Sequence, residues 1–194
     1  MKIENKRQLK KILKKEKETY WTKKDKKKYV LDIFKKNPIY YSWKYVFYMR
    51  KANYYYEVRR KNIFMALMYM FYIRKMNNIG RKNGIECGEH VFDEGVKIFH
   101  TQGIVINGNS VIGKNCRLYG NNCIGNDGIE NECPQIGDNV KICVGAKILG
   151  NVTIADNVIV AAGAVVVESC DKQGAILAGV PARIIGYNEK KFLE

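Results

Sequence analysis

The side chain best suited to proton transfer near neutral pH in this sequence is His100, which directly precedes a strongly periodic stretch. The chain has only one other histidine, His90. An imidazole can act as a general base, which typically contributes about 10²–10⁴-fold to a rate. It can also be a turn residue whose ring is satisfied by a backbone carbonyl. Both interpretations of His100 remain open at this point, and we interpret His90 as a structural or surface residue.

The remaining residues that could take part in catalysis or metal binding argue against several classes of site. Six cysteines occur without any CxxC pair, which favours free thiols in a reducing cytoplasm. A zinc enzyme of the γ-class carbonic anhydrase kind needs several histidines, so we expect no metal. The N-terminus is rich in lysine with no apolar core behind it, so we expect no signal peptide. The longest apolar run, residues 63–73, is too short to span a bilayer, which needs about 20 residues.

Charge is distributed very unevenly along the chain. Residues 1–90 hold 25 Lys and Arg against 8 Asp and Glu, a balance of +17, whereas residues 91–194 hold 9 against 11, a balance of −2. The excess is typical either of a solvated, lysine-rich helical face or of a surface for an anionic partner such as a membrane or a polyanionic glycan. No zinc-finger or RNA-recognition motif accompanies it, so we expect no nucleic acid.

Residues 1–83 are predicted to form a basic, aromatic-rich α-helical region. Glycine is absent before Gly80, and Pro38 is the only proline there. The first 36 residues have sparse apolar positions, which indicates a marginal amphipathic helix. Residues 39–72 are crowded with aromatic side chains at helical spacing. This pattern favours a core or a helix–helix interface, but it also fits an aromatic and cationic surface that would place residues 1–75 on an anionic membrane.

A six-residue period dominates the second half of the chain. Stepping by six from Ile106 to Val166 meets an aliphatic residue at ten of eleven positions, and stepping from Asn109 to Gly163 meets Asn, Asp or Gly at nine of ten. An inward aliphatic residue followed by one that tolerates a left-handed backbone predicts short strands joined by sharp corners. Three such units make an 18-residue coil, and coils stack about 4.8 Å apart. The pattern predicts a parallel β-helix, a mainly β fold, over residues 84–187.

The period also predicts which residues stack and where the coil is interrupted. The two exceptions, Glu130 and Cys133, fall within residues 125–135, which we expect to leave the coil as a loop and rejoin it in register. Loops on rigid scaffolds often carry specificity. A slip of two residues between Ile104 and Ile112 predicts a bulge beside His100. Residues 18 apart are expected to form two inward columns, Leu118–Ile136–Ile154 and Ile124–Ile142–Val160.

Three stretches within residues 84–186 resemble a known family. They are FHTQGIVINGNSVIG, VGAKILGNVTIADNVIVAAGAVV and the exit AGVPARIIG. Together with the hexapeptide period they resemble the hexapeptide-repeat acyltransferases, and in particular the serine O-acetyltransferase-like branch found among surface-polysaccharide O-acetyltransferases. The resemblance implies a left-handed β-helix, a homotrimer, and acetyl-CoA as co-substrate bound between neighbouring subunits, with no metal.

The resemblance also implies roles for individual residues. His100 matches the catalytic histidine of the family, which removes the proton from an acceptor hydroxyl as that hydroxyl attacks the thioester carbonyl. Arg183 matches a position near the phosphate end of the cofactor, where a cation is favourable. The positions that match contacts to acetyl-CoA are Val144, Gly145, Ala162, Gly163 and Arg183.

Two departures from serine O-acetyltransferases bear on the acceptor. Phe99 stands where the family has an aspartate before the catalytic histidine, so Asp93, Glu94 or a backbone carbonyl would have to orient His100. Glu132 and Cys133 stand where the family has an Arg-His pair, and a carboxylate there disfavours serine. We therefore expect a saccharide hydroxyl of a capsule, O-antigen or other surface polysaccharide as acceptor. Its predicted binding residues are Asn121, Asn122, Asn126, Glu132 and Cys133, since carboxylate and amide groups suit sugar hydroxyls.

Other functions remain open from the sequence. The chain could be a serine O-acetyltransferase of cysteine biosynthesis, or a catalytically silent β-helix scaffold, and N-acetylation of an amino sugar would use the same base. We expect a cytoplasmic protein working at the inner face of the membrane. The predicted organisation is a helical region over residues 1–83, an acyltransferase β-helix over 84–187 with its acceptor loop at 125–135, and a tail at 188–194.

Overall fold

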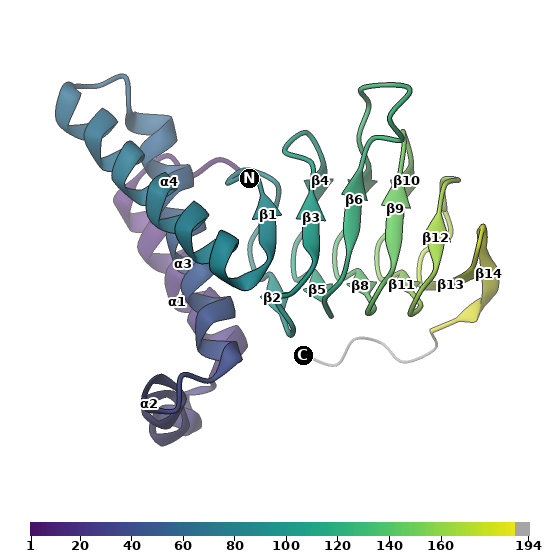
Figure 1. Cartoon of the computed structure of the whole chain (residues 1–194), viewed down its shortest axis with the longest axis horizontal. Coiled ribbons are helices and arrows are strands. Elements are labelled where there is room, and N and C mark those ends of the chain that lie inside the picture. Colours follow the sequence, from purple (N-terminus) through teal and green to yellow (C-terminus); the bar gives the residue numbers. More distant parts are fainter. Residues whose placement is uncertain (189–194) are drawn as a thin grey trace.

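The computed structural model describes residues 1–188, which form a cluster of helices followed by a long β-helix (Figure 1). Of the predicted tail 188–194, only Asn188 lies within the described residues. The predicted fold class, a mainly β parallel β-helix preceded by helices, is confirmed.

The helices begin and end where the sequence provides capping groups. Asn5 and Asn62 each accept a hydrogen bond from the backbone N–H three residues later, at 2.9 Å, and Pro38 takes the first helical position of its helix. Gly84 ends the last helix in a left-handed conformation with φ 69°. The helical elements are α1 (Lys6–Tyr20), η1 (Lys23–Asp25), α2 (Lys26–Phe34), α3 (Pro38–Val58) and α4 (Ile63–Asn83).

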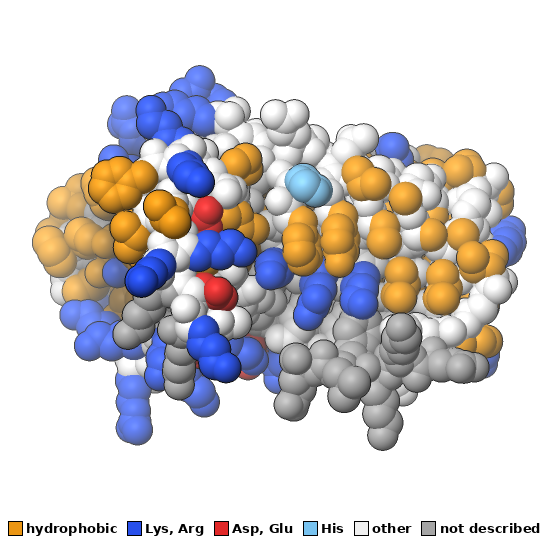
Figure 2. Space-filling view, turned by 90° about the horizontal axis from the view of Figure 1, so that it is seen from below, with side chains coloured by type: hydrophobic (Ala, Val, Ile, Leu, Met, Phe, Trp, Pro, Cys, Tyr) orange, Lys and Arg blue, Asp and Glu red, His pale blue; other side chains and the backbone are white. Residues whose placement is uncertain are grey.

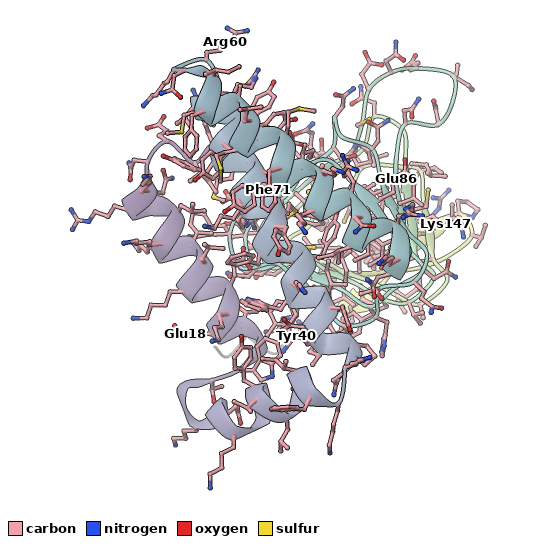
Figure 3. All side chains as sticks on the ribbon, turned by 60° about the vertical axis from the view of Figure 1, so that its left-hand side comes forward. Glu18, Tyr40, Arg60, Phe71, Glu86 and Lys147 are labelled. Atoms are coloured by element: carbon pink, nitrogen blue, oxygen red, sulfur yellow. The ribbon has the colours of Figure 1, made fainter. Side chains whose placement is uncertain are left out.

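The helical region is built around α3, which lies between α1 and α4 (Figure 3). Its side chains Tyr45, Val46 and Met49 are fully enclosed and join the core of the β-helix. In contrast, α4 leaves much of its apolar surface in solvent, although the sequence gives it the same aromatic character. Among residues 1–188, no helix is both long enough and apolar enough to cross a membrane.

The β-helix consists of three sheets whose strands follow one another coil by coil. The first sheet has the order β1-β3-β6-β9-β12, the second β10-β7-β4, and the third β14-β13-β11-β8-β5-β2. Every pairing is parallel except the last, β13 with β14. The strands are β1 (Ile85–Cys87), β2 (Lys97–Ile98), β3 (Ile104–Ile106), β4 (Val111–Ile112), β5 (Arg117–Leu118), β6 (Cys123–Gly125), β7 (Gln135–Ile136), β8 (Lys141–Ile142), β9 (Lys147–Leu149), β10 (Thr153–Ile154), β11 (Ile159–Val160), β12 (Val165–Val166), β13 (Ala175–Gly179) and β14 (Ala182–Tyr187).

The two residue types of the period play the roles that the sequence predicts. The inward aliphatic residues are buried, and many of the corner residues take a positive φ. The corner asparagines also bond to one another between coils: Asn115 donates to Asn139 at 3.0 Å, and Asn139 donates to Asn157 at 3.2 Å. The positive-φ corner residues of this phase are Asn115, Asn121, Asn139, Gly145, Asn157 and Gly163.

The predicted columns are only partly right, because the loop changes the register. Leu118 pairs with Ile142, not with Ile136, since an extra hexapeptide in the loop makes the offset across it 24 residues. Beyond the loop the 18-residue offset holds, for Ile136 with Ile154 and for Ile142 with Val160. The resulting inward columns are Ile112–Ile136–Ile154, Ile98–Leu118–Ile142–Val160–Leu177 and Ile106–Ile124–Ile148–Val166.

The slip in the period also falls at a different place from the one predicted. Ile98 pairs with Leu118 and Ile106 pairs with Ile124, so eight residues separate the inward positions in one coil and six in the next. The two additional residues therefore lie between β2 and β3, in the segment that contains His100. The prediction that they follow Ile104 is wrong, because Ile106 rather than Ile104 continues the inward column.

A buried ion pair joins the helices to the first coil. Arg50 of α3 and Glu16 of α1 are both fully buried, and the guanidinium contacts the Glu16 carboxylate at 2.6 and 2.9 Å. The same guanidinium donates to the backbone oxygens of Phe92 and Asp93, at 2.7 and 2.5 Å. The carboxylate also accepts from the backbone N–H of Gly95 at 3.2 Å. We refer to this cluster as the Arg50 junction.

Candidate functional site

One corner of the β-helix brings together most of the predicted site residues. It is the turn between the third sheet and the first, and successive coils pass through it at residues 99–103, 119–122, 143–146 and 161–164. We call it the His100 corner. It runs along the lower edge of the molecule in Figure 1, and Figure 2 looks onto that edge.

His100 is exposed at the first turn of this corner and lies directly against Gly120 of the next coil. A Cβ atom added to Gly120 would lie 2.9 Å from the Cβ of His100, and Gly120 has φ 100°. Both facts require glycine at this position. The close approach of the two coils therefore fixes the backbone of His100 without burying its ring.

Neither nearby carboxylate orients the imidazole. Glu94 pairs with Lys15 at 2.9 Å, and a carboxylate oxygen of Asp93 accepts the backbone N–H of Glu94 at 2.7 Å. Within residues 1–188, no side chain or backbone group makes a hydrogen bond to the His100 ring. The ring is therefore exposed and accessible at the corner.

The predicted acetyl-CoA residues follow His100 along the same corner. Val144 is 52% exposed, and Ala162 and Gly163 also reach the surface. Gly145 donates its backbone N–H to Gly120 at 3.0 Å, and Gly163 donates to Val144 at 3.0 Å. Gly145 and Gly163 have φ 75° and 68°, so both are corner-turning glycines. The turns of successive coils thus form a partly apolar strip of mostly small residues that begins beside His100.

Arg183 lies in the last strand, near the far end of this strip. It pairs with Ala178 of β13, whose preceding residue Leu177 accepts the backbone N–H of Ala161 at the corner. Its guanidinium contacts Glu168 at 2.9 Å, and both side chains are more than half exposed. An exposed ion pair of this kind is weak, so the guanidinium could exchange Glu168 for an anionic ligand.

The predicted acceptor residues are divided between two places. Asn121 is an exposed residue of the His100 corner with φ 51°. Asn122 is fully buried, and its amide accepts from Gly120 N at 3.0 Å and donates to Cys143 O at 2.7 Å. Asn122 therefore holds two coils together and offers no free group to an acceptor, in contrast to its predicted role.

The other predicted acceptor residues lie in the loop at residues 125–135. Asn126 is held within the loop, since it donates to Glu130 O at 2.9 Å and accepts from Asn107 at 3.2 Å. Glu132 is exposed, whereas Cys133 is buried with its thiol 3.6 Å from Asn131 O. Burial removes Cys133 from any surface that an acceptor could reach in this chain.

The loop and the His100 corner lie at opposite edges of the first sheet. In Figure 1 the loop projects from the upper end of β6, while the corner lies at the lower end. Five residues of extended chain separate Asn121 from Asn126, which corresponds to about 17 Å. Within one chain, the loop therefore does not close over His100.

Sequence reasoning missed a row of basic and aromatic residues beside the corner. Lys97, Arg117 and Lys141 are register neighbours on β2, β5 and β8 of the third sheet. Next to them, the rings of Phe99 and Tyr119 stack with centroids 4.5 Å apart and an interplanar angle of 6°. A pattern in the sequence could have predicted this row, because each cation directly precedes an inward aliphatic residue, in the pairs KI, RL and KI. Figure 2 shows basic side chains beside a row of hydrophobic ones along this edge.

Residues for metal or thiol chemistry are not grouped in the described part of the chain. Among residues 1–188, no three side chains of His, Cys, Asp or Glu gather closely enough to hold a metal ion. All six cysteines are free. Burial raises the pKa of the Cys143 thiol, which lies on the corner itself, and thereby disfavours its reactive thiolate.

Comparison with known proteins agrees with this geometry. Residues 133–167 match the family model of the bacterial transferase hexapeptide (six repeats). The serine acetyltransferase of Staphylococcus xylosus is 33% identical over 135 residues, which cover 69% of this chain and 60% of that protein. The chain therefore spans less than two thirds of the length of this relative.

Solved structures show the same similarity. The serine acetyltransferase of Vibrio cholerae O1 biovar El Tor N16961 is 25% identical, with a TM-score of 0.66 over 77% of this chain and 56% of the other. The serine acetyltransferase of Brucella abortus strain S19, solved in complex with coenzyme A, is 20% identical, with a TM-score of 0.72 over 96% of this chain and 71% of the other. The second match shows similarity of fold alone.

These findings correct the prediction about the acceptor. The relatives are named serine acetyltransferases, so a saccharide acceptor and the surface-polysaccharide branch are not supported, and the prediction of a saccharide O-acetyltransferase is wrong. The structure supplies a physical reason. The residues predicted to bind a sugar do not form one surface, because Asn122 and Cys133 are buried and the loop lies away from the His100 corner.

Proposed function

We propose that this chain is an acetyl-CoA-dependent O-acetyltransferase of the hexapeptide-repeat class, and that its acceptor is the hydroxyl of serine. The observation that carries the proposal is the His100 corner, where an exposed imidazole lies in line with Val144, Gly145, Ala162 and Gly163. The similarity to serine acetyltransferases supports both the donor and the acceptor.

In the proposed reaction, His100 acts as a general base. Its neutral imidazole takes the proton from the serine hydroxyl as that oxygen attacks the thioester carbonyl of acetyl-CoA. The carbon–sulfur bond then breaks, and the coenzyme A sulfur receives the proton from the imidazolium. A base of this kind is efficient because its pKa lies near the working pH. No covalent intermediate on the protein is required, so the cysteines take no part.

The donor would lie along the strip of small corner residues. Gly145, Ala162 and Gly163 have little or no side chain, so the pantetheine arm can approach the backbone closely. Arg183 would bind a phosphate group at the far end of the strip, in exchange for its contact with Glu168. Acetyl-CoA supplies the acetyl group and the leaving thiolate.

A complete site requires more than one copy of the chain. The loop at residues 125–135 is too far from His100 of the same chain to cover it, whereas the loop of a neighbouring copy could do so. This supports the homotrimer that the sequence resemblance implies. Acetyl-CoA as donor also fits the cytoplasmic location expected from the sequence.

The first experiment is acetyl transfer followed by mass spectrometry, with acetyl-CoA and L-serine as substrates. We expect O-acetylserine and free coenzyme A in equal amounts. The matched variant is His100→Ala, checked for folding by circular dichroism and for assembly by light scattering. Full transfer by a folded His100→Ala protein would overturn the role of the base. Absence of any acetyl transfer by the wild-type protein would favour a catalytically silent scaffold.

We also propose that the helical region contacts an anionic membrane surface through α4. Its exposed apolar side chains follow helical spacing, and cations accompany them: Arg74, Lys75 and Arg81 line the same groove as Met70 and Phe71. An apolar face edged by cations is typical of helices that lie in the membrane interface. The exposed apolar residues of α4 are Ile63, Phe64, Leu67, Met70 and Phe71.

Vesicle flotation tests this contact. We expect the full chain to float with vesicles containing phosphatidylglycerol and not with neutral phosphatidylcholine vesicles, and to be released by salt. The double variant Phe64→Ser/Leu67→Ser should lose binding. Ile185→Ser, on the exposed strand β14, is the matched control. Equal binding by the double variant and the wild type would rule out α4 as the contact.

A further inference from the structure

The row of cations beside the His100 corner has no role in the function proposed above. Lys97, Arg117 and Lys141 occupy neighbouring rungs of the third sheet, where strands lie about 4.8 Å apart. Like charges in direct register repel one another, so such a row destabilises the fold unless an anion neutralises it. The sheet therefore places Lys97 and Arg117 side by side, which favours binding of an anionic ligand.

Two members of the row lack an acidic partner among the described residues. Neither Lys97 nor Arg117 makes a salt bridge within residues 1–188, and the Arg117 guanidinium makes no hydrogen bond there. The amine of Lys97 lies over aromatic rings, 4.9 Å from the centroid of Phe99 and 6.0 Å from that of Tyr20. Burial, Arg117 and Lys28 all lower the pKa of Lys97, and no carboxylate of the described chain opposes them.

Along the chain, the aromatic pair lies between the row and His100. Phe99 directly precedes His100 in the chain, and its ring stacks on that of Tyr119, whose neighbour Gly120 lies against His100. The amine of Lys97 lies over Phe99, so it leans along the strand toward the corner. Aromatic rings exclude water and lower the local dielectric constant, which strengthens pairing between a cation and an anion.

The loop at residues 125–135, which in the proposed homotrimer would reach the His100 corner from a neighbouring copy, carries the opposite charge. Glu132 is exposed, and the loop also carries Asp127 and Glu130. A carboxylate on the acceptor would be repelled there, whereas the row on the third sheet would attract it. The acidic loop and the cationic row would therefore orient an acceptor with its carboxylate toward the row. This requires that the carboxylate and the hydroxyl of the acceptor lie close together.

We propose that Lys97 and Arg117 bind the carboxylate of the acceptor whose hydroxyl is deprotonated by His100. The acceptor class is then a small hydroxy acid. This inference rests on the proposed acetyl transfer at His100 and specifies which part of the acceptor the enzyme recognises. Arg117 supplies a planar, two-pronged donor that suits a carboxylate, and Lys97 adds a second positive charge.

The test compares L-serine with L-serinamide, which lacks the carboxylate. For the wild-type enzyme we expect kcat/KM to be roughly 10- to 100-fold higher with L-serine, the difference that a charge-assisted hydrogen bond typically makes. Arg117→Gln should bring this ratio close to one, mainly by raising the KM for L-serine. Arg117→Lys should restore part of the preference. Lys114→Gln, at an exposed lysine on another corner, is the matched control.

Two results would overturn the inference. One is an unchanged preference for L-serine in Arg117→Gln and Lys97→Gln. The other is a rise in the KM for acetyl-CoA instead of the acceptor, which would mean that the row binds the phosphate groups of the donor. In both cases acetylation of serine by the wild type would still stand.

A wider acceptor panel separates this inference from the choice of serine. If L-serine is not acetylated but another small hydroxy acid, such as glycerate or lactate, is acetylated in a manner that depends on Arg117, the inference is supported and serine is wrong. If only neutral acceptors are acetylated, the inference is overturned. Calorimetry measures how tightly each acid binds to the wild type and to Arg117→Gln. These affinities should rank in the same order as the rates of acetylation.

Discussion

The Arg50 junction and the His100 corner show two ways of fixing a segment of chain. At the junction, the buried guanidinium of Arg50 and the buried carboxylate of Glu16 join α3, α1 and the first coil through one set of hydrogen bonds. At the corner, backbone hydrogen bonds repeat from coil to coil, and side chains such as His100 remain exposed. The junction fixes three parts of the chain through one buried ion pair, whereas the corner distributes its backbone hydrogen bonds over many coils and leaves side chains exposed for chemistry.

The largest expected effect separates chemistry from stability at the corner. His100→Ala should lower kcat by about 10²–10⁴-fold while leaving the thermal midpoint unchanged, because the ring is exposed and makes no hydrogen bond within residues 1–188. His90→Ala is the contrasting variant. Its ring packs against Tyr56 and contacts the Asn53 amide at 3.0 Å, so stability should fall while kcat is kept.

Kinetics and differential scanning fluorimetry on both variants check this contrast. A large loss of stability in His100→Ala, or a loss of kcat in His90→Ala at a temperature where the protein is folded, would contradict it.

The next effect concerns stability at the junction. Arg50→Met should cost about 3–5 kcal/mol of unfolding free energy, since it leaves the buried Glu16 carboxylate without its counter-ion and two backbone oxygens without their donor. The exposed pair Lys15–Glu94 is the matched control, and Lys15→Ala should cost less than about 1 kcal/mol. Urea unfolding measures both, and similar losses would show that the junction is no stronger than a surface pair.

A smaller effect tests how the corner positions His100. Gly120→Ala should cost about 1–3 kcal/mol, because φ at this position is 100° and the new Cβ would press on His100. It should also lower kcat by displacing the imidazole. Gly108→Ala is the control, because nothing lies within 4 Å of its added Cβ. Full activity in Gly120→Ala would mean that the position of His100 does not depend on this contact.

The smallest effect is a titration. Burial, Arg117 and Lys28 lower the pKa of Lys97 from its ordinary value of 10.5, so Lys97 should deprotonate at a lower pH in the folded protein than in the unfolded chain. Because the unfolded chain would hold this proton more tightly, the contribution of Lys97 to stability rises with pH through this window. Carbon-13 NMR of the lysine side chains measures the pKa, and Arg117→Gln should move it upward. A normal pKa for Lys97 in the wild type would contradict the crowding of cations in the row.

The sequence predicts the repeated part of the molecule well because each repeat contains the residues that determine its own strand and turn. An aliphatic residue and a corner residue three positions later are enough to specify strand and turn, so the six-residue period alone identifies the β-helix. The stacking of Leu118 on Ile142 could not be predicted in this way, since the period does not reveal how many residues a loop removes from the coil. The place of the slip near His100 could not be predicted either, because Ile104 and Ile106 are both buried aliphatic residues and only the pairing of Ile106 with Ile124 shows which one continues the inward column.

The non-repeated contacts could not be predicted from pattern. Arg50 and Glu16 lie 34 residues apart in the chain and belong to no motif, so only folding reveals that they meet. Positions taken from the family resemblance fared unevenly. His100, Val144 and Gly163 share one corner, whereas Cys133 is buried, because a resemblance gives residue positions and says nothing about exposure. Asn122, predicted because its amide suits a sugar hydroxyl, is buried as well.

The ends of the β-helix determine whether molecules can join end to end. A stack of parallel strands presents unpaired N–H and C=O groups at both ends, and a second molecule could continue the stack there. At one end α3 and α4 pack against β2 and β1, and at the other β14 reverses direction and lies antiparallel to β13 (Figure 1). Both terminations interrupt coil-by-coil continuation, so the same repeat that makes the scaffold rigid is kept from growing into a fibre.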